Sequence, residues 1–183
     1  MLVKLKINLY GETFRHNLVD GVISSTVNKK PSFIEYVEDG TGSINLFVDL
    51  AILEAHKTKS DKPNYGWLLE SNCIHPQLVE KFKNNQSYIN YFNNIFTHNL
   101  ELTNLSEKFK FMYPTGYWVD EIKDIKKTKL ISMIASSKKS TVGQKKRNKI
   151  ARKYKNKVDL FGEGRNFIKK KEEGLLDYCF SIV

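Results

Sequence analysis

The sequence of 183 residues has little cysteine, no long hydrophobic run and no excess of acidic residues. Its two cysteines, Cys73 and Cys179, are far apart and outside any Cys-x-x-Cys pattern, so neither a disulfide framework nor a zinc site is predicted. No apolar run approaches the roughly 18 residues of a membrane span. Lys4 and Lys6 interrupt the N-terminal apolar residues too regularly for a signal-peptide core. We therefore expect a cytoplasmic protein in a reducing compartment, with no membrane partner.

The sequence also has no internal repeat, no low-complexity tract and neither of the common glycine-rich phosphate motifs. The patterns Gly-x-Gly-x-x-Gly and Gly-x-x-x-x-Gly-Lys-Ser/Thr are both missing, which argues against a nicotinamide site and a P-loop. It does have a net charge of +10 and 40% hydrophobic residues, which suits one or two modest globular domains.

The first part of the chain alternates strand and helix patterns. Val3, Leu5, Ile7 and Leu9 alternate with polar residues, which predicts a strand with one buried face. Pro76 suits the first position of a helix. The stretch 44–53 is too uniformly apolar to classify. A turn is predicted at 39–43, further strands at 65–70, 94–98 and 109–114, and helices at 75–85 and 99–108.

A second block with the same alternation follows a charged segment. We predict an N-terminal domain over 1–118, a linker over 119–127 and a second domain over 128–183. In the second domain, strands are predicted at 129–136, 157–162 and 178–183, and helices at 143–156 and 168–175. Strands that alternate with helices at this spacing imply parallel sheets, so the expected fold is α/β with two Rossmann-like units.

The helix predicted at 143–156 is strongly basic. Ile150, Ala151, Tyr154 and Val158 form one apolar stripe that would pack on the sheet, so most of its lysines should face water. Extending the stripe backwards reaches Lys146 and Arg147, in the first turn of the helix and just after the carboxyl end of a strand. Arg147 is the basic residue best placed to meet a phosphate. Parallel sheets bind ligands at this end, and helix N-termini favour anions. From the residues alone, the alternative that Arg147 simply caps a solvated charged helix is favoured, because charge runs are usually solvated faces.

Several segments resemble the family 10 glycosyltransferases, the alpha-1,3-fucosyltransferases and their phage and bacterial relatives. The segment "KLISMIASSKKSTVGQKKRNKIARKYKNKVDLFGEG" followed by "GLLDYCFSIV" is similar to the start of the family's nucleotide-binding domain. In the first block, "YGWLLESNCIHPQL", "YFNNIFTHNLEL" and "FKFMYPTGYWV" resemble the acceptor-side domain of viral and bacterial members. The likeness covers residues from about Tyr65 onwards.

This resemblance implies a GT-B-like pair of domains that transfers a sugar from a GDP-sugar such as GDP-fucose to a glycan hydroxyl with inversion. Glu70 matches the family's candidate catalytic base, and Arg147 the arginine that contacts the donor diphosphate. Ser136 and Ser137 fall where the family often has Ser-Asn in a donor-binding loop, and Trp118 is an acceptor-site candidate. Glu70 remains open to a second interpretation, a surface carboxylate that pairs with lysine or caps the next helix. No metal and no cofactor are expected.

The family pattern continues beyond "FSIV" with a segment that supplies most donor contacts, so the resemblance implies that the second domain is incomplete. We expect a fragment, a truncated product, or one part of a split enzyme whose second chain supplies the missing segment. His75, His98 and Trp67 are weaker candidates, which fit turn and core positions better. The alternative function is a basic nucleic-acid-binding α/β protein, with 145–157 as the contact helix. This helix has an ordinary packing stripe and lacks interleaved exposed aromatic residues that could stack on bases, so we do not expect a nucleic-acid partner.

Overall fold

The computed structural model describes residues 4–12, 18–19, 22–24, 30–113, 119 and 124–182. The chain divides into two compact units, Met1–Gly116 and Tyr117–Val183, which are called unit 1 and unit 2 below. Each unit is described by itself. No helix in these described ranges is long and apolar enough to cross a membrane.

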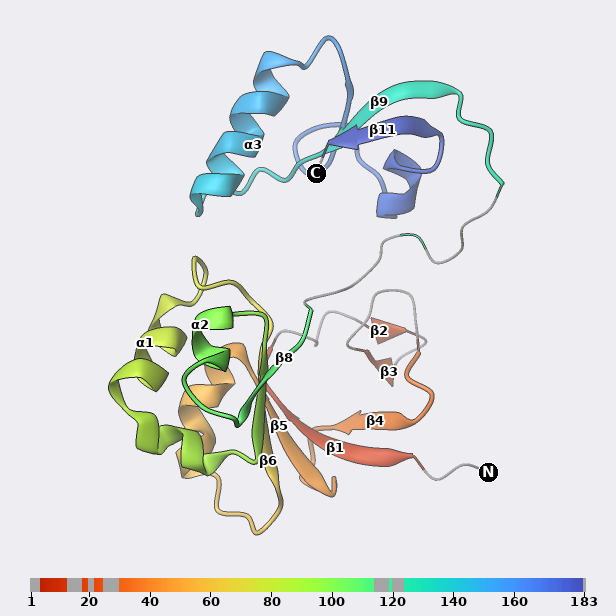
Figure 1. Cartoon of the computed structure of the whole chain (residues 1–183). Helices are drawn as coiled ribbons and strands as arrows, with labels where there is room; N and C mark the ends of the chain where they lie inside the picture. Colours follow the sequence, from red (N-terminus) through yellow and green to blue (C-terminus); the bar gives the residue numbers. More distant parts are fainter. Residues whose placement is uncertain are drawn as a thin grey trace. The chain divides into compact units, whose positions relative to one another are not determined.

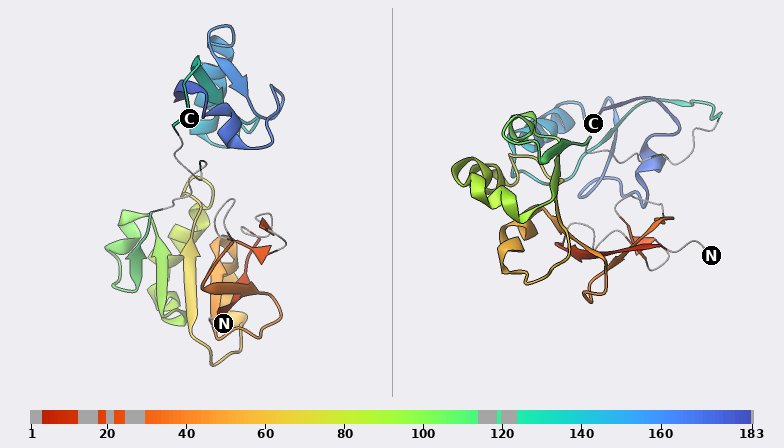
Figure 2. Two further views of the ribbon diagram at one scale, coloured as in Figure 1. Left: turned by 90° about the vertical axis from the view of Figure 1, so that its right-hand side faces the viewer. Right: turned by 60° about the horizontal axis from the view of Figure 1, so that its bottom comes forward.

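Unit 1 is built on a six-stranded sheet in which all neighbouring strands are parallel, as the sequence predicted (Figures 1 and 2). Across the sheet, the strands follow the order β4 (Ile34–Val37), β1 (Leu5–Tyr10), β5 (Ile44–Val48), β6 (Asn64–Leu68), β7 (Asn94–Thr97) and β8 (Phe109–Phe111). A two-stranded antiparallel hairpin, β2 (Leu18–Val19) and β3 (Val22–Ile23), lies outside this sheet.

The helical segments of unit 1 gather on one face of the sheet (Figure 1). They are η1 (Asp49–Lys57), α1 (Pro76–Asn84), η2 (Gln86–Tyr91) and α2 (Leu100–Thr103), where η marks a 3-10 helix. Phe47 of the sheet packs edge to face on Phe92, and Phe82 of α1 packs in the same way on Phe109. These buried rings make the main core of the chain, because large aromatic side chains bury the most apolar surface.

The opposite face of the same sheet carries a smaller buried cluster and an apolar pocket of about 360 Å³. Trp67 of β6 is only partly buried there and lines the pocket with Tyr65 from the same strand. Trp67 therefore belongs to the sheet face rather than to the main core. The other lining side chains are Ile7, Tyr36, Ile44, Leu46, Phe96 and Met112.

Unit 2 has a three-stranded parallel sheet with the order β10 (Asp159–Phe161), β9 (Lys129–Ile134) and β11 (Tyr178–Ile182). Helix α3 (Val142–Lys153) buries Ala151 against Met133 on one face. The short helix η3 (Lys171–Gly174) packs on the other face, where Gly174 lies close to the Ile134 side chain. This arrangement agrees with the Rossmann-like α/β class predicted for the second block.

The structure corrects several details of the sequence interpretation. The predicted helix 168–175 is only the single 3-10 turn η3, and the helix predicted at 143–156 begins at Val142 and ends at Lys153. The ambiguous stretch 44–53 divides into β5 and the start of η1. Ile150, which was placed on the packing stripe, is 40% exposed. Asn148 is buried instead, and its side chain is hydrogen-bonded within unit 2.

Candidate functional site

The start of α3 is fixed by a capping box. The Thr141 hydroxyl accepts a hydrogen bond from the Gln144 backbone N–H (3.2 Å), and the Gln144 side-chain oxygen accepts one from the Thr141 backbone N–H (3.2 Å). Such reciprocal bonds satisfy N–H groups that have no partner within the helix. Because the helix begins at Val142, Arg147 is its sixth residue and lies in the second turn, not in the first turn as the sequence suggested.

Arg147 lines a pocket of about 530 Å³ at the carboxyl end of β9, which is called the Arg147 pocket below. Ser136 lies two residues beyond the end of β9, Arg147 comes from α3 and Lys171 comes from η3, so three segments converge on this space. The structure therefore brings together two of the predicted donor-binding residues, Ser136 and Arg147. The remaining lining residues are Ile134, Lys138, Gln144, Gly162, Glu163, Ile168 and Lys169.

Positive charge accumulates in the Arg147 pocket. Burial lowers the pKa of the Lys171 ammonium, and the nearby charges of Arg147 and Lys138 lower it further. The charged form of Lys171 is thus disfavoured by its own surroundings. An anion in the pocket would reverse this effect by offsetting the repulsion among these three cations and Lys169, which also lines the pocket. Sequence reasoning missed Lys138 and Lys171, since nothing in the basic runs around them showed which lysines converge.

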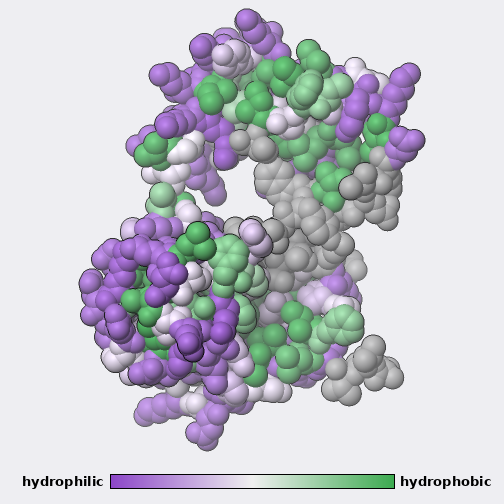
Figure 3. Space-filling view, in the orientation of Figure 1, coloured by the Kyte–Doolittle hydropathy of each residue, from purple (hydrophilic) through white to green (hydrophobic). Residues whose placement is uncertain are grey.

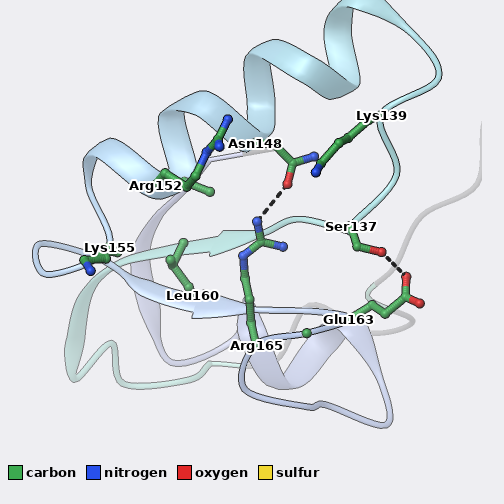
Figure 4. A pocket seen from close by; sticks show the side chains of 10 residues that line it. Ser137, Lys139, Asn148, Arg152, Lys155, Leu160, Glu163 and Arg165 are labelled. Carbon is green, nitrogen blue, oxygen red and sulfur yellow. Dashed lines mark hydrogen bonds between the residues drawn. The ribbon is translucent and has the colours of Figure 1, made fainter.

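Ser137, the third predicted donor-binding residue, lines a different pocket of about 390 Å³ on the α3 and β10 side of unit 2 (Figure 4). This space is called the Arg165 pocket below. The Ser137 hydroxyl donates a hydrogen bond to the Glu163 carboxylate at 2.7 Å. Glu163 lines both pockets, so the Ser137–Glu163 pair stands where they adjoin. The other lining residues are Lys139, Asn148, Ala151, Arg152, Lys155, Leu160, Gly164 and Arg165.

A polar network holds the walls of the Arg165 pocket together. The Arg165 guanidinium donates to the Ala135 carbonyl (2.6 Å) and to the Asn148 side-chain oxygen (2.8 Å). The Asn148 side-chain amide in turn donates to the carbonyls of Lys138 (2.9 Å) and Gln144 (3.0 Å). These bonds explain why a polar residue, only 7% exposed, occupies the inner face of α3. They also fix the loop between β9 and α3 that carries Ser136 and Ser137.

Gly162 allows β10 and the end of β9 to come together. Its φ of +119° lies in a region that L side chains rarely adopt, and a Cβ there would clash with the Ala135 carbonyl oxygen. Ala135 N–H also donates to the Phe161 carbonyl at 2.9 Å. At the "FGEG" sequence, the backbone after β10 therefore lies close to the backbone at Ala135, and this contact supports the walls of both pockets.

Glu70, the predicted base, lies in unit 1 just beyond the carboxyl end of β6 and is exposed. Among the described residues its carboxylate forms no ion pair with a lysine, and the N-cap of α1 is His75. Neither of the two structural roles considered for Glu70 is therefore present in the described part of the chain. Glu70 and Arg147 belong to different units.

The backbone around Glu70 is held by Asp49, a residue that the sequence did not single out. The Asp49 carboxylate accepts hydrogen bonds from the backbone N–H groups of Leu69 (2.8 Å) and Glu70 (3.0 Å). Asp49 is 2% exposed and has a φ of +48°, a conformation that is uncommon for a residue other than glycine. Strained residues of this kind cluster at functional sites.

Trp118, the predicted acceptor-site residue, lies outside the residues that the structure describes. The described ranges contain no group of three or more His, Cys, Asp or Glu side chains that could hold a metal ion.

Comparison with protein-family models gave no match, and no curated protein sequence matches significantly.

Proposed function

We propose that this chain is a glycosyltransferase of the family 10 type, which transfers a sugar from a GDP-sugar donor to a glycan hydroxyl with inversion. The Arg147 pocket is the single observation that carries this proposal. It lies at the carboxyl end of a parallel strand, where α/β proteins bind nucleotides, and Lys138, Arg147 and Lys171 converge on it. A diphosphate is a small, dense anion that matches such a group of cations.

In the proposed reaction the acceptor hydroxyl attacks the anomeric carbon of the donor sugar. The new carbon–oxygen bond forms as the bond to the diphosphate breaks, and the hydroxyl proton passes to the Glu70 carboxylate. Arg147 stabilises the negative charge of the departing diphosphate. Ser136 lines the same pocket and Ser137 is the next residue of that loop, so both are proposed to contribute to donor binding. Asp49 keeps the Glu70 backbone in place, and Trp118 contributes to acceptor binding. The two units then act as the two halves of a GT-B enzyme.

Binding of GDP to the full chain, measured by isothermal titration calorimetry, tests this proposal. Arg147→Gln should weaken GDP binding about tenfold or more, because a charge-assisted hydrogen bond to phosphate is lost. Lys146→Gln is the matched control, since it removes the same charge from the neighbouring exposed position, outside the pocket. Glu70→Gln should leave GDP affinity unchanged. Equal weakening by the Arg147 and Lys146 variants would contradict a specific diphosphate site.

One observation favours a second candidate function, nucleic-acid binding. Residues 138–157 contain ten Lys or Arg and no Asp or Glu, and Figure 3 shows hydrophilic side chains gathered over α3. A polyanion would release counterions on binding to this segment, so its affinity would fall steeply with salt. Binding of arbitrary DNA or RNA that is strongly salt-dependent, together with no binding of GDP, would favour this candidate over the glycosyltransferase.

A further inference from the structure

The Arg165 pocket concentrates cations from separate segments of unit 2. Lys139 comes from the loop after β9, Arg152 and Lys155 from α3 and the residues just after it, and Arg165 from the loop after β10 (Figure 4). Within the described part of the chain, none of these four side chains forms an ion pair with a carboxylate. The positive charge of the pocket is therefore not neutralised by an ion pair among the described residues.

The acidic residue among the lining side chains does little to neutralise these cations. The Glu163 carboxylate is exposed and accepts the Ser137 hydroxyl bond. In Figure 4 this pair lies on one side of the pocket, and Arg152 and Lys155 lie on the other. Four cations and one carboxylate leave an excess of three positive charges around the pocket.

Arg165 is held in place before any ligand arrives. Its hydrogen bonds to the Ala135 carbonyl and to the buried Asn148 side chain fix the guanidinium across the pocket. A guanidinium carries five N–H groups, so further donors remain for a ligand oxygen. Because the side chain is already ordered, binding costs less conformational entropy than it would for a mobile surface arginine.

We propose that the Arg165 pocket is a phosphate-binding site separate from the Arg147 pocket. A phosphomonoester carries close to two negative charges at neutral pH and several strong acceptor oxygens, which suits an excess of positive charge and a fixed arginine fork better than a single carboxylate does. The volume of about 390 Å³ exceeds that of one phosphate group, so the ligand is a phosphorylated small molecule or the headgroup of a phosphomonoester lipid. The inference does not depend on the proposed glycosyltransferase activity.

The primary test is a titration of the full chain with inorganic phosphate at constant ionic strength, followed by nuclear magnetic resonance. The side-chain N–H signals of Arg152 and Arg165 should shift with saturation. Arg152→Gln should weaken phosphate binding about tenfold, because it removes one charge-assisted contact. Lys153→Gln is the matched control, since Lys153 is exposed and does not line the pocket, and it should change the affinity less than twofold.

Lys139→Gln provides a second lining variant outside the helix, so a folding defect in one variant does not decide the result. Arg147→Gln should leave this phosphate site intact, which separates failure of this proposal from failure of the GDP site. Equal weakening by Arg152→Gln and Lys153→Gln, or signals of Arg165 that do not move, would overturn the proposal, since either result indicates only a diffuse basic surface.

Two further arms identify the source of the phosphate. A soluble ligand is supported if glycerol 3-phosphate binds at least as tightly as inorganic phosphate and the protein shows no preference for phosphatidic acid vesicles over phosphatidylserine vesicles. Preference for phosphatidic acid vesicles that is lost in Arg152→Gln supports a lipid headgroup. Equal binding of both vesicle types by both the Arg152 and Lys153 variants, without binding of soluble phosphate, overturns the site.

Discussion

The two units differ sharply in where they place charge and apolar surface. Residues 1–116 contain twelve Lys or Arg and twelve Asp or Glu, whereas residues 117–183 contain eighteen and eight, so the whole net charge of +10 lies in unit 2. The described core of unit 1 has clusters of thirteen and five buried residues, and that of unit 2 a cluster of only three, Met133, Ala135 and Ala151.

This contrast indicates that the units are stabilised in different ways. Unit 1 is held by apolar packing, which is non-directional and roughly proportional to buried area. Unit 2 has little apolar area to bury and relies on directional bonds such as those of Asn148 and Arg165. Directional networks also fix the positions of charged groups, and unit 2 is the unit whose cations line the Arg147 and Arg165 pockets.

The largest effect should come from the core of unit 1. Phe82 is fully buried and packs on Phe109, Phe92 and Tyr88, so Phe82→Ala should destabilise unit 1 by about 3–5 kcal/mol. Hydrogen exchange of the full chain in urea should show faster opening in β7 and little change in β9. Equal losses of amide protection in β7 and β9 would show that the two units unfold together, and the contrast between the units would then not apply to their stability.

A smaller loss should follow from Gly162→Ala in unit 2. The new Cβ would meet the Ala135 carbonyl oxygen, and the positive φ would be strained, so we expect a cost of about 2–4 kcal/mol. Gly164→Ala is the control, because its φ is also positive but a Cβ there has open space around it. Exchange of the β9 amides distinguishes the two. Similar losses in both variants would mean that strain, rather than the close approach, is decisive.

The sequence predicts much of the strand and helix order because its signals are local. Pro76 marks the start of α1, and the strands from β5 to β8 and from β9 to β11 alternate with helical segments as expected. The described elements from β1 to β5 are all strands, which departs from that alternation. The boundaries of α3 depend on the Thr141 cap, and the burial of Asn148 depends on Arg165, seventeen positions away. Hydrophobic periodicity treats asparagine as exposed and Ile150 as buried, and here a long-range polar network reverses both.

The candidate site shows the same limit. Ser136 and Arg147 share a pocket because loop and helix meet at one strand end, which the alternation of strand and helix could indicate. Lys171, Glu163 and Arg165 could not be selected, since they come from segments whose fold depends on the turn at Gly162. Asp49 could not be selected either, because its role depends on hydrogen bonds to residues twenty positions away.

Alkaline pH should destabilise unit 2 through Tyr178. Burial, the hydrogen bond to Asp159 (2.8 Å) and the charges of Asp159 and Asp177 together raise the pKa of Tyr178 to about 12. Because the folded-state pKa lies above the unfolded value, this contribution is complete below pH 10.0 and is lost as the pH rises through about 12. Tyr178→Phe should flatten this loss of stability with pH, which is measured from the exchange of the β9 amides. An unchanged pH profile would contradict the assignment.

The smallest effect should come from salt. The ten cations of residues 138–157 repel one another, and sodium chloride shortens the range of that repulsion to about 10 Å at 0.1 M. Added salt should therefore stabilise unit 2 by about 1 kcal/mol or less. Unit 1, whose charges balance, is the internal control. Urea is the denaturant of choice because guanidinium chloride is itself a salt. The effect is measured by hydrogen exchange in urea. If added salt stabilises β7 more than β9, salt acts through apolar burial, and the charge of unit 2 does not limit its stability.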